Sequence, residues 1–213
     1  MLYTVLRAIV KPIVYLLFNI KFAGLENIRD KGGFVLCSNH RTLLDPVFIL
    51  VGIKKRKLRF MAKQELFKNK LLAAFFKSVG AFPVNRGKGD MVAVKKAEEI
   101  VERNHILLIF PEGTRSKTGR LLRFKSGAAH IASDAGADIV PAAICYDGRL
   151  AFRKKITVCF GQPIKHEDIK LGENTRIEDS RKVSLLVKEK VAELLMANIS
   201  AASKKACDKE DAE

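Results

Sequence analysis

Short apolar runs alternate with longer amphipathic stretches, and this alternation limits the folds open to the chain more than any other feature. The apolar runs predict buried strands at Phe34–Cys37, Leu58–Met61, Ala81–Val84, His105–Phe110, Ile139–Ile144 and Ile156–Phe160. Helical spacing predicts helices at Pro46–Gly52, Gln64–Val79, Asp90–Arg103, Ser126–Ala135 and Ile177–Ile199. Strands that alternate with helices indicate an α/β fold with a largely parallel or mixed central sheet.

The length of 213 residues predicts one domain, because domains average about 150 residues and the chain shows neither an internal repeat nor a low-complexity linker. With 48% hydrophobic and 29% charged residues, the composition excludes a mostly disordered chain. We divide the chain into an N-terminal helix at 1–22, a single domain at 23–200 and a polar tail at 201–213.

The first twenty residues are the most hydrophobic stretch, but Arg7 and Lys11 interrupt them. A charge near the bilayer centre costs roughly 2.5–3.5 kcal/mol, which disfavours a membrane span. A cleaved signal peptide is also disfavoured, since the apolar run is short and no Ala-x-Ala site follows. The polar residues fall in one helical sector, with Pro12 predicted to kink the helix. This pattern predicts an amphipathic helix in the membrane interface, with packing on the protein's own core as the alternative.

The net charge of +16 indicates anionic partners, which can be nucleic acid, an anionic membrane surface or acidic ligands. A second stretch, residues 54–77, mixes nine basic residues with apolar ones. Together with the N-terminal helix it favours peripheral or monotopic association with the cytoplasmic face of the cell membrane. The alternative is a solvated basic face over a core helix.

The four cysteines form neither a disulfide pattern nor a zinc pattern, because no Cys-x-x-Cys occurs. Cys37, Cys145 and Cys159 lie in apolar, strand-like runs, whereas Cys207 lies in the polar tail. We expect three buried thiols and one exposed thiol, as in a reducing cytoplasm.

A first candidate site is the sequence from Asn39 to Pro46, between a predicted strand and a predicted helix. Asp45 followed by Pro46 is typical of a helix start, with aspartate as the N-cap. If the chain turns back at Asp45, one carboxylate oxygen caps the helix and the other accepts the Nδ1 proton of His40. Nε2 is then free to act as a base. The alternative is a capping residue and an unrelated loop histidine.

A second candidate site, Phe110 to Ser116, follows the clearest strand, where ligands bind in open α/β sheets. Gly113 allows a tight turn, and Thr114 and Arg115 can donate hydrogen bonds to a phosphate. Glu112 would repel a phosphate, so it braces the loop or contacts an acceptor hydroxyl. An ordinary Pro-Glu-Gly turn is the alternative.

Two more candidate residues stand at predicted element ends, and a third stands within a predicted strand. Arg86 follows the strand at 81–84, and Lys125 precedes a helix start, where a cation and a helix N-terminus attract anions. Each can equally be a solvated surface charge. Pro141 lies within a predicted strand and predicts an edge or a bulge position.

Taken together, these blocks resemble the glycerolipid acyltransferase family. Asn-His-(x)4-Asp, Gly-x-Phe-x-x-x-Arg, Phe-Pro-Glu-Gly-Thr-Arg-Ser and Val-Pro occur in this order between about Gly24 and Pro163. The resemblance implies an αβ acyltransferase domain, with acyl transfer from a thioester (acyl-CoA or acyl carrier protein) to the sn-2 hydroxyl of 1-acyl-sn-glycerol 3-phosphate. Phosphatidic acid for phospholipid biosynthesis would be the product.

The resemblance also implies roles for single residues. His40 and Asp45 would be the catalytic pair, and the acceptor would be held by Arg86, Glu112, Gly113, Thr114 and Arg115. We add Lys125 on electrostatic grounds. No residue is placed as a serine or cysteine nucleophile, so we expect direct transfer without an acyl-enzyme, a metal or a cofactor.

Two alternatives stay open. One is the same chemistry on another acceptor, such as glycerol 3-phosphate or a different lysolipid. The other is a basic module that binds nucleic acid or anionic lipid without catalysis. No nucleic-acid motif occurs, and such a module gives no reason for a His-Asp pair beside a Glu-Gly-Thr-Arg loop, so we expect no nucleic-acid partner.

Overall fold

The computed structural model describes residues 2–85, 90–172 and 177–210. Its centre is a seven-stranded sheet with the order β1-β7-β6-β2-β5-β3-β4. The strands are β1 (Asn19–Ala23), β2 (Phe34–Ser38), β3 (Leu58–Lys63), β4 (Ala81–Val84), β5 (Ile106–Ile109), β6 (Ile139–Cys145) and β7 (Lys155–Phe160). All neighbours are parallel except β6 and β7. The predicted α/β class with a largely parallel sheet is confirmed.

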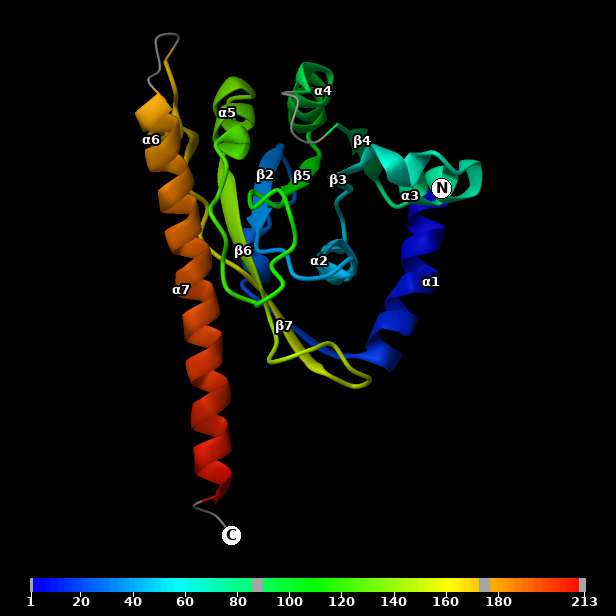
Figure 1. The fold of residues 1–213 in the computed structure, drawn as a ribbon, viewed down its shortest axis with the longest axis vertical. Coiled ribbons are helices and arrows are strands. Elements are labelled where there is room, and N and C mark those ends of the chain that lie inside the picture. The colour runs from blue at the N-terminus through cyan, green and yellow to red at the C-terminus, as the bar shows by residue number, and fades with distance from the viewer. Residues whose placement is uncertain (1, 86–89, 173–176, 211–213) are drawn as a thin grey trace.

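Helices cover both faces of the sheet (Figure 1). Their bounds are α1 (Leu2–Leu17), α2 (Asp45–Gly52), α3 (Lys70–Ser78), α4 (Met91–Glu102), α5 (Gly127–Asp134), α6 (His166–Ile169) and α7 (Ile177–Glu210), with 3-10 turns η1 (Leu25–Asn27) and η2 (Gln64–Phe67). Successive side chains of a strand point to opposite faces. In β2, Phe34 and Leu36 therefore pack under α1 and α2, whereas Val35 and Cys37 pack under α4, α5 and α7.

Three predicted elements differ from the structure by more than two residues. The N-terminal helix predicted for 1–22 ends at Leu17, and residues 19–23 form β1, which pairs in parallel with β7. The helix predicted for 64–79 is divided into η2 and α3, because the side chain of Asn69 accepts the amide hydrogens of Leu71 and Leu72 and starts a new helix. The last helix continues to Glu210 rather than ending at Ile199.

The outer surface of α1 is apolar, and its inner surface packs on the domain. Val14 is buried in the core under α1 and α2, and Arg7 donates from its guanidinium to the carbonyls of Ile53 and Lys54 at the end of α2. Four apolar side chains on the opposite side are about half exposed or more, at 54%, 53%, 48% and 66%: Val5, Ile9, Ile13 and Leu16. We call these four residues the outer face of α1. Among the helices of the described residues, none is both long and apolar enough to span a bilayer.

Pro141 is not at an edge, because β6 lies between β7 and β2. Its carbonyl accepts the amide hydrogen of Gly161, so its nitrogen also faces the β7 side. The β6–β7 ladder begins only at Ala142, opposite Phe160. The missing N–H therefore lies just beyond the ladder, which is why an interior strand tolerates this proline.

The cysteine prediction is confirmed where the structure describes the side chains. Cys37, Cys145 and Cys159 are free and buried. Burial raises the pKa of the Cys37 thiol well above its ordinary value, so this group stays protonated. The side chain of Cys207 lies outside the described residues.

Candidate active site

His40 and Asp45 meet in a tight turn between β2 and α2. His40 Nδ1 lies 2.8 Å from Asp45 Oδ2. The same oxygen accepts the amide hydrogens of Arg41 at 2.5 Å and Thr42 at 2.8 Å, and Oδ1 accepts the Thr42 hydroxyl at 2.8 Å. The predicted contact between His40 and Asp45 is present in the structure.

The predicted helix-capping role of Asp45 is wrong. Asp45 is already the first residue of α2, and Leu44 precedes it as the cap residue without a side-chain hydrogen bond. The carboxylate turns back toward residues 40–42 instead of accepting amide hydrogens of its own helix. All its hydrogen bonds therefore hold the turn that carries the imidazole.

The second predicted site lies directly against the first, because β2 and β5 are parallel neighbours and their carboxyl ends are adjacent. Glu112 Oε1 accepts the His40 amide hydrogen at 2.9 Å, and the His40 carbonyl accepts the Ser116 amide hydrogen at 2.8 Å. The imidazole stacks on the Phe110 ring, with 4.1 Å between centroids and 18° between planes. Both backbone polar groups and one ring face of His40 are thus held by the segment after β5.

Glu112 is buried, and both of its carboxylate oxygens accept backbone amide hydrogens. It is 4% exposed, and its second oxygen, Oε2, accepts the amide hydrogen of Leu122 at 3.1 Å. Burial raises the pKa of this carboxyl, while the amide hydrogens of His40 and Leu122 oppose that shift. Of the two roles the sequence left open for Glu112, the geometry favours bracing the loop over contact with the acceptor.

Neighbours of His40 attach the turn to β6. The Asn39 side chain donates to the Ile144 carbonyl at 3.1 Å and accepts the Ile144 amide hydrogen at 2.8 Å. Arg41 donates to the carbonyls of Tyr146 at 2.5 Å and Gly148 at 2.9 Å, and its guanidinium lies 3.9 Å from the Tyr146 ring centroid. These contacts hold the residues on both sides of the imidazole.

Most of the remaining residues predicted to bind the acceptor lie at or near a turn at Gly113. Gly113 has a φ of +69°, and a side chain added there would come within 3.0 Å of Lys125 Nζ. Lys125 also donates its amide hydrogen to the Pro111 carbonyl at 2.9 Å. Thr114, Arg115 and Lys125 are exposed on the segment that carries Glu112. Arg86 lies outside the described residues.

Sequence reasoning missed the residues that hold the turn. The two candidate segments contain most of them, namely Asn39, Arg41, Phe110 and Ser116. Their closeness in sequence to His40 and Glu112 could have identified them. Tyr146 has no such signal, because it lies 105 residues from Arg41 and is brought there by the sheet.

The arrangement is suited to proton transfer. Within the described part of the chain, His40 Nε2 forms no hydrogen bond and is not among the buried polar atoms without a partner, so solvent reaches it. The described residues contain no cluster of His, Cys, Asp or Glu that could hold a metal ion. An imidazole oriented through Nδ1 by a buried carboxylate is the arrangement of a general base.

A doubly covered, mostly parallel sheet with a His-Asp pair at the carboxyl ends of its strands is compatible with acyl-transfer enzymes. The family model for acyltransferases matches residues 19–145, and the chain belongs to this acyltransferase family.

Curated relatives and a solved structure agree with this. The chain is 34% identical over 161 residues to the 1-acyl-sn-glycerol-3-phosphate acyltransferase of Bacillus subtilis, covering 74% of this chain and 80% of that protein. It is 32% identical over 189 residues to the enzyme of the same name from Streptococcus pneumoniae, covering 84% and 68%. The crystal structure of the 1-acyl-sn-glycerophosphate acyltransferase from Thermotoga maritima has the same fold, with a TM-score of 0.67 and 24% identity over 90% of this chain and 80% of that one.

Proposed function

We propose that this protein transfers an acyl chain from a thioester donor to the sn-2 hydroxyl of 1-acyl-sn-glycerol 3-phosphate, which yields phosphatidic acid for phospholipid synthesis. The observation that carries the proposal is the 2.8 Å contact between His40 Nδ1 and a buried Asp45, with Nε2 open to solvent. The names of the relatives from Bacillus subtilis and Streptococcus pneumoniae support this acceptor.

In the proposed reaction, Nε2 of His40 takes the proton of the acceptor hydroxyl while its oxygen attacks the thioester carbonyl carbon. The carbon–sulfur bond then breaks, and the imidazolium, stabilised by Asp45, returns the proton to the thiolate. Arg115 and Lys125, exposed beside Gly113, bind the acceptor phosphate.

The surroundings of the site support direct transfer without an acyl-enzyme. Cys37 and Ser38 lie just before the turn, and each has 0% exposure. The Ser38 hydroxyl lies 3.4 Å from the Asn39 side-chain oxygen, and burial keeps the Cys37 thiol protonated through its raised pKa. Neither group meets the requirements of an activated nucleophile.

The test is a matrix of donors and acceptors with purified protein in liposomes. Acyl-CoA and acyl carrier protein thioesters are combined with lysophosphatidic acid, glycerol 3-phosphate and a lysolipid without a phosphomonoester. We expect lysophosphatidic acid to be the preferred acceptor and His40→Ala to abolish its acylation. His130→Gln, at an exposed position of α5, is the matched control. Substantial turnover by a folded His40→Ala variant would refute the base role, and preference for another acceptor would change the substrate.

We further propose that α1 attaches the protein peripherally to the cytoplasmic face of the cell membrane. The outer face of α1 is apolar, and α3, which contacts α1, exposes Leu71, Leu72 and Phe75. Together with the net charge of +16, these surfaces suit an anionic bilayer. Replacing Ile9 and Ile13 by Asp should abolish flotation with anionic liposomes. Leu185→Asp, at an exposed position of α7, should not, and equal flotation of all variants would contradict the proposal.

A further inference from the structure

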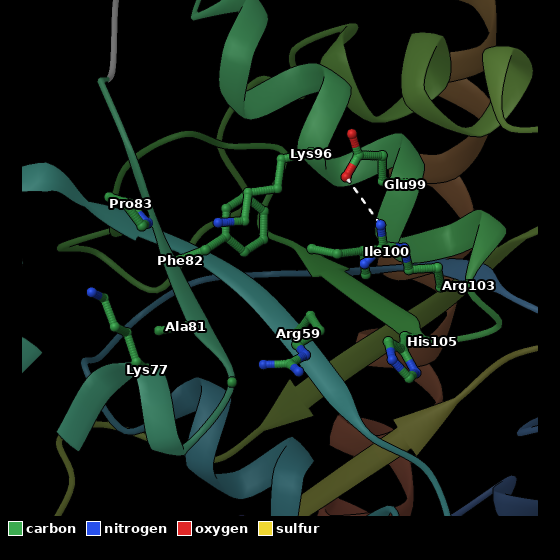
Figure 2. Close-up of a pocket in the computed structure, with 11 residues that line it drawn as sticks. Arg59, Lys77, Ala81, Phe82, Pro83, Lys96, Glu99, Ile100, Arg103 and His105 are labelled. Atoms are coloured by element: carbon green, nitrogen blue, oxygen red, sulfur yellow. Dashed lines mark ion pairs between the residues drawn. The ribbon is translucent and has the colours of Figure 1, made fainter. Parts of the chain in front are cut away.

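A basic cavity of about 330 Å³ lies at the β4 edge of the sheet, away from the His-Asp turn. It is lined by β3, β4, α4, the last turn of α3 and the residue before β5, and Figure 2 shows its side chains grouped around the hollow. The volume lies within the range of small-molecule sites, roughly 300–1,000 Å³.

The lining has an excess of positive charge. The cations are Arg59, Lys77, Lys96 and Arg103, with His105 beside them, whereas Glu99 is the one carboxylate of the lining and pairs with Arg103 at 3.9 Å. Burial lowers the pKa of His105, and the nearby cations, Arg59 and Arg103 among them, lower it further. The cavity therefore has a positive potential, which attracts anions.

The floor of the cavity is apolar. Phe82 of β4 and Ile100 of α4 line it on the α4 face of the sheet; Phe82 is 4% exposed, and Lys96 Nζ lies 5.6 Å from the centroid of its ring. The half-buried Ile100 can contact an apolar group such as a base, while the surrounding cations bind a phosphate. A compact hollow of this size favours a small ligand over a nucleic acid or a protein partner, which need a much larger surface.

The cavity is separate from the site of acyl transfer. His105 and Phe110 stand at opposite ends of β5, about 16 Å apart at 3.3 Å per residue. Strand β4 is three positions from β2 in the sheet, or about 14 Å. A phosphate bound beside Arg115 is therefore too far away to lie in this cavity as well.

We propose that this cavity is a second anion-binding site, which takes a phosphorylated ligand with a flat apolar group, the chemistry of a nucleotide. Two sources share that chemistry, a free nucleotide and the nucleotide portion of coenzyme A. Arg59 and Lys96 bind the phosphate, and the base lies against the apolar part of the lining, where the side chain of Ile100 is half-buried.

The test is calorimetric titration of the purified protein with adenosine 3′,5′-bisphosphate at low salt, with no turnover required. We expect saturable binding that is tighter than binding of inorganic phosphate or of adenosine. Lys96→Gln and Arg59→Gln should each weaken it about tenfold, because each loses a charge-assisted hydrogen bond. Coenzyme A that displaces the bisphosphate would identify the coenzyme as the source, and failure to displace it would identify a free nucleotide.

Two variants separate this site from general charge attraction. Lys95→Gln removes the same charge from the neighbouring exposed position of α4, outside the lining, and Arg115→Gln removes a cation from the acyl-transfer site. Neither should change the affinity. Absence of saturable binding to the wild type, or equal weakening by Lys95→Gln and Lys96→Gln, would overturn the proposal. Greater weakening by Arg115→Gln would do the same.

Discussion

The turn that carries His40 and the segment that carries Arg115 lie side by side but are built differently. In the turn, Asp45 is fully buried and accepts four hydrogen bonds from the turn residues. In the segment, Thr114 and Arg115 are exposed. Proton transfer requires fixed geometry, whereas attraction of a phosphate tolerates mobile cations in water. We therefore expect mutations in the turn to affect catalysis and those in the exposed segment to affect binding.

The largest effect is expected for Asp45→Asn. The amide cannot accept every hydrogen bond that both carboxylate oxygens accept, so the tautomer and orientation of the imidazole are lost. We expect kcat to fall by about two to four orders of magnitude, as in other enzymes where the aspartate behind a histidine base becomes an amide. Steady-state acylation kinetics with circular dichroism would measure this. Asp134→Asn, at an exposed position of α5, is the control, and a kcat near that of the wild type would show that the turn does not depend on this carboxylate.

A smaller effect is expected for Arg115→Gln, and it should change KM rather than kcat. The side chain is exposed, so its loss leaves the turn intact and removes one cation for the phosphate. We expect the KM for the acceptor to rise about tenfold with little change in kcat, and the rise to shrink at high salt as screening weakens the wild-type contact. Lys188→Gln on α7 controls for the loss of one positive charge. A fall in kcat at unchanged KM would place Arg115 in the chemical step and break the distinction between the two regions.

Local pattern predicted most elements, and contacts between distant segments explain the errors. Strand β1 continues the apolar run of α1 without a break, and only its pairing with β7, more than 130 residues later, identifies it as a strand. Arg7 belonged to the predicted polar sector of an interfacial helix. Its actual partners are the carbonyls at the end of α2, which the helical pattern of residues 1–20 does not contain.

In the site, too, contacts between residues close in sequence could be predicted and contacts between distant segments could not. His40 and Asp45 are five residues apart, so their contact could be predicted from a turn between a strand and a helix. The role of Glu112 could not be decided, because its partner, the His40 amide, lies 72 residues away and is reached only through the pairing of β2 with β5. The capping role expected for Asp45 was wrong for a related reason. Its carboxylate accepts hydrogen bonds from Arg41 and Thr42 instead of from the amides of its own helix.

The smallest expected effect concerns Glu112, which joins the two regions. Burial raises its pKa above the ordinary carboxyl value that applies in the unfolded chain. Between these two values the folded state keeps the proton that the unfolded state loses, so rising pH favours unfolding. The contribution of Glu112 to stability is therefore full below the ordinary pKa and falls as the pH rises through the raised one. Glutamine does not titrate, so the excess Tm of the wild type over Glu112→Gln should decrease as the pH rises from about 4.

Thermal unfolding at a series of pH values measures this difference, and only its slope is interpreted. Glutamine also replaces one of the two carboxylate acceptors, which serve the amides of His40 and Leu122, by a donor, but that loss does not depend on pH. Glu189→Gln, at an exposed position of α7, controls for the removal of one carboxylate. An excess that grows with pH would mean that the amide hydrogens of His40 and Leu122 outweigh burial. Glu112 would then stabilise the site as a charged carboxylate. The contact between the turn and the segment would depend on that charge rather than on packing.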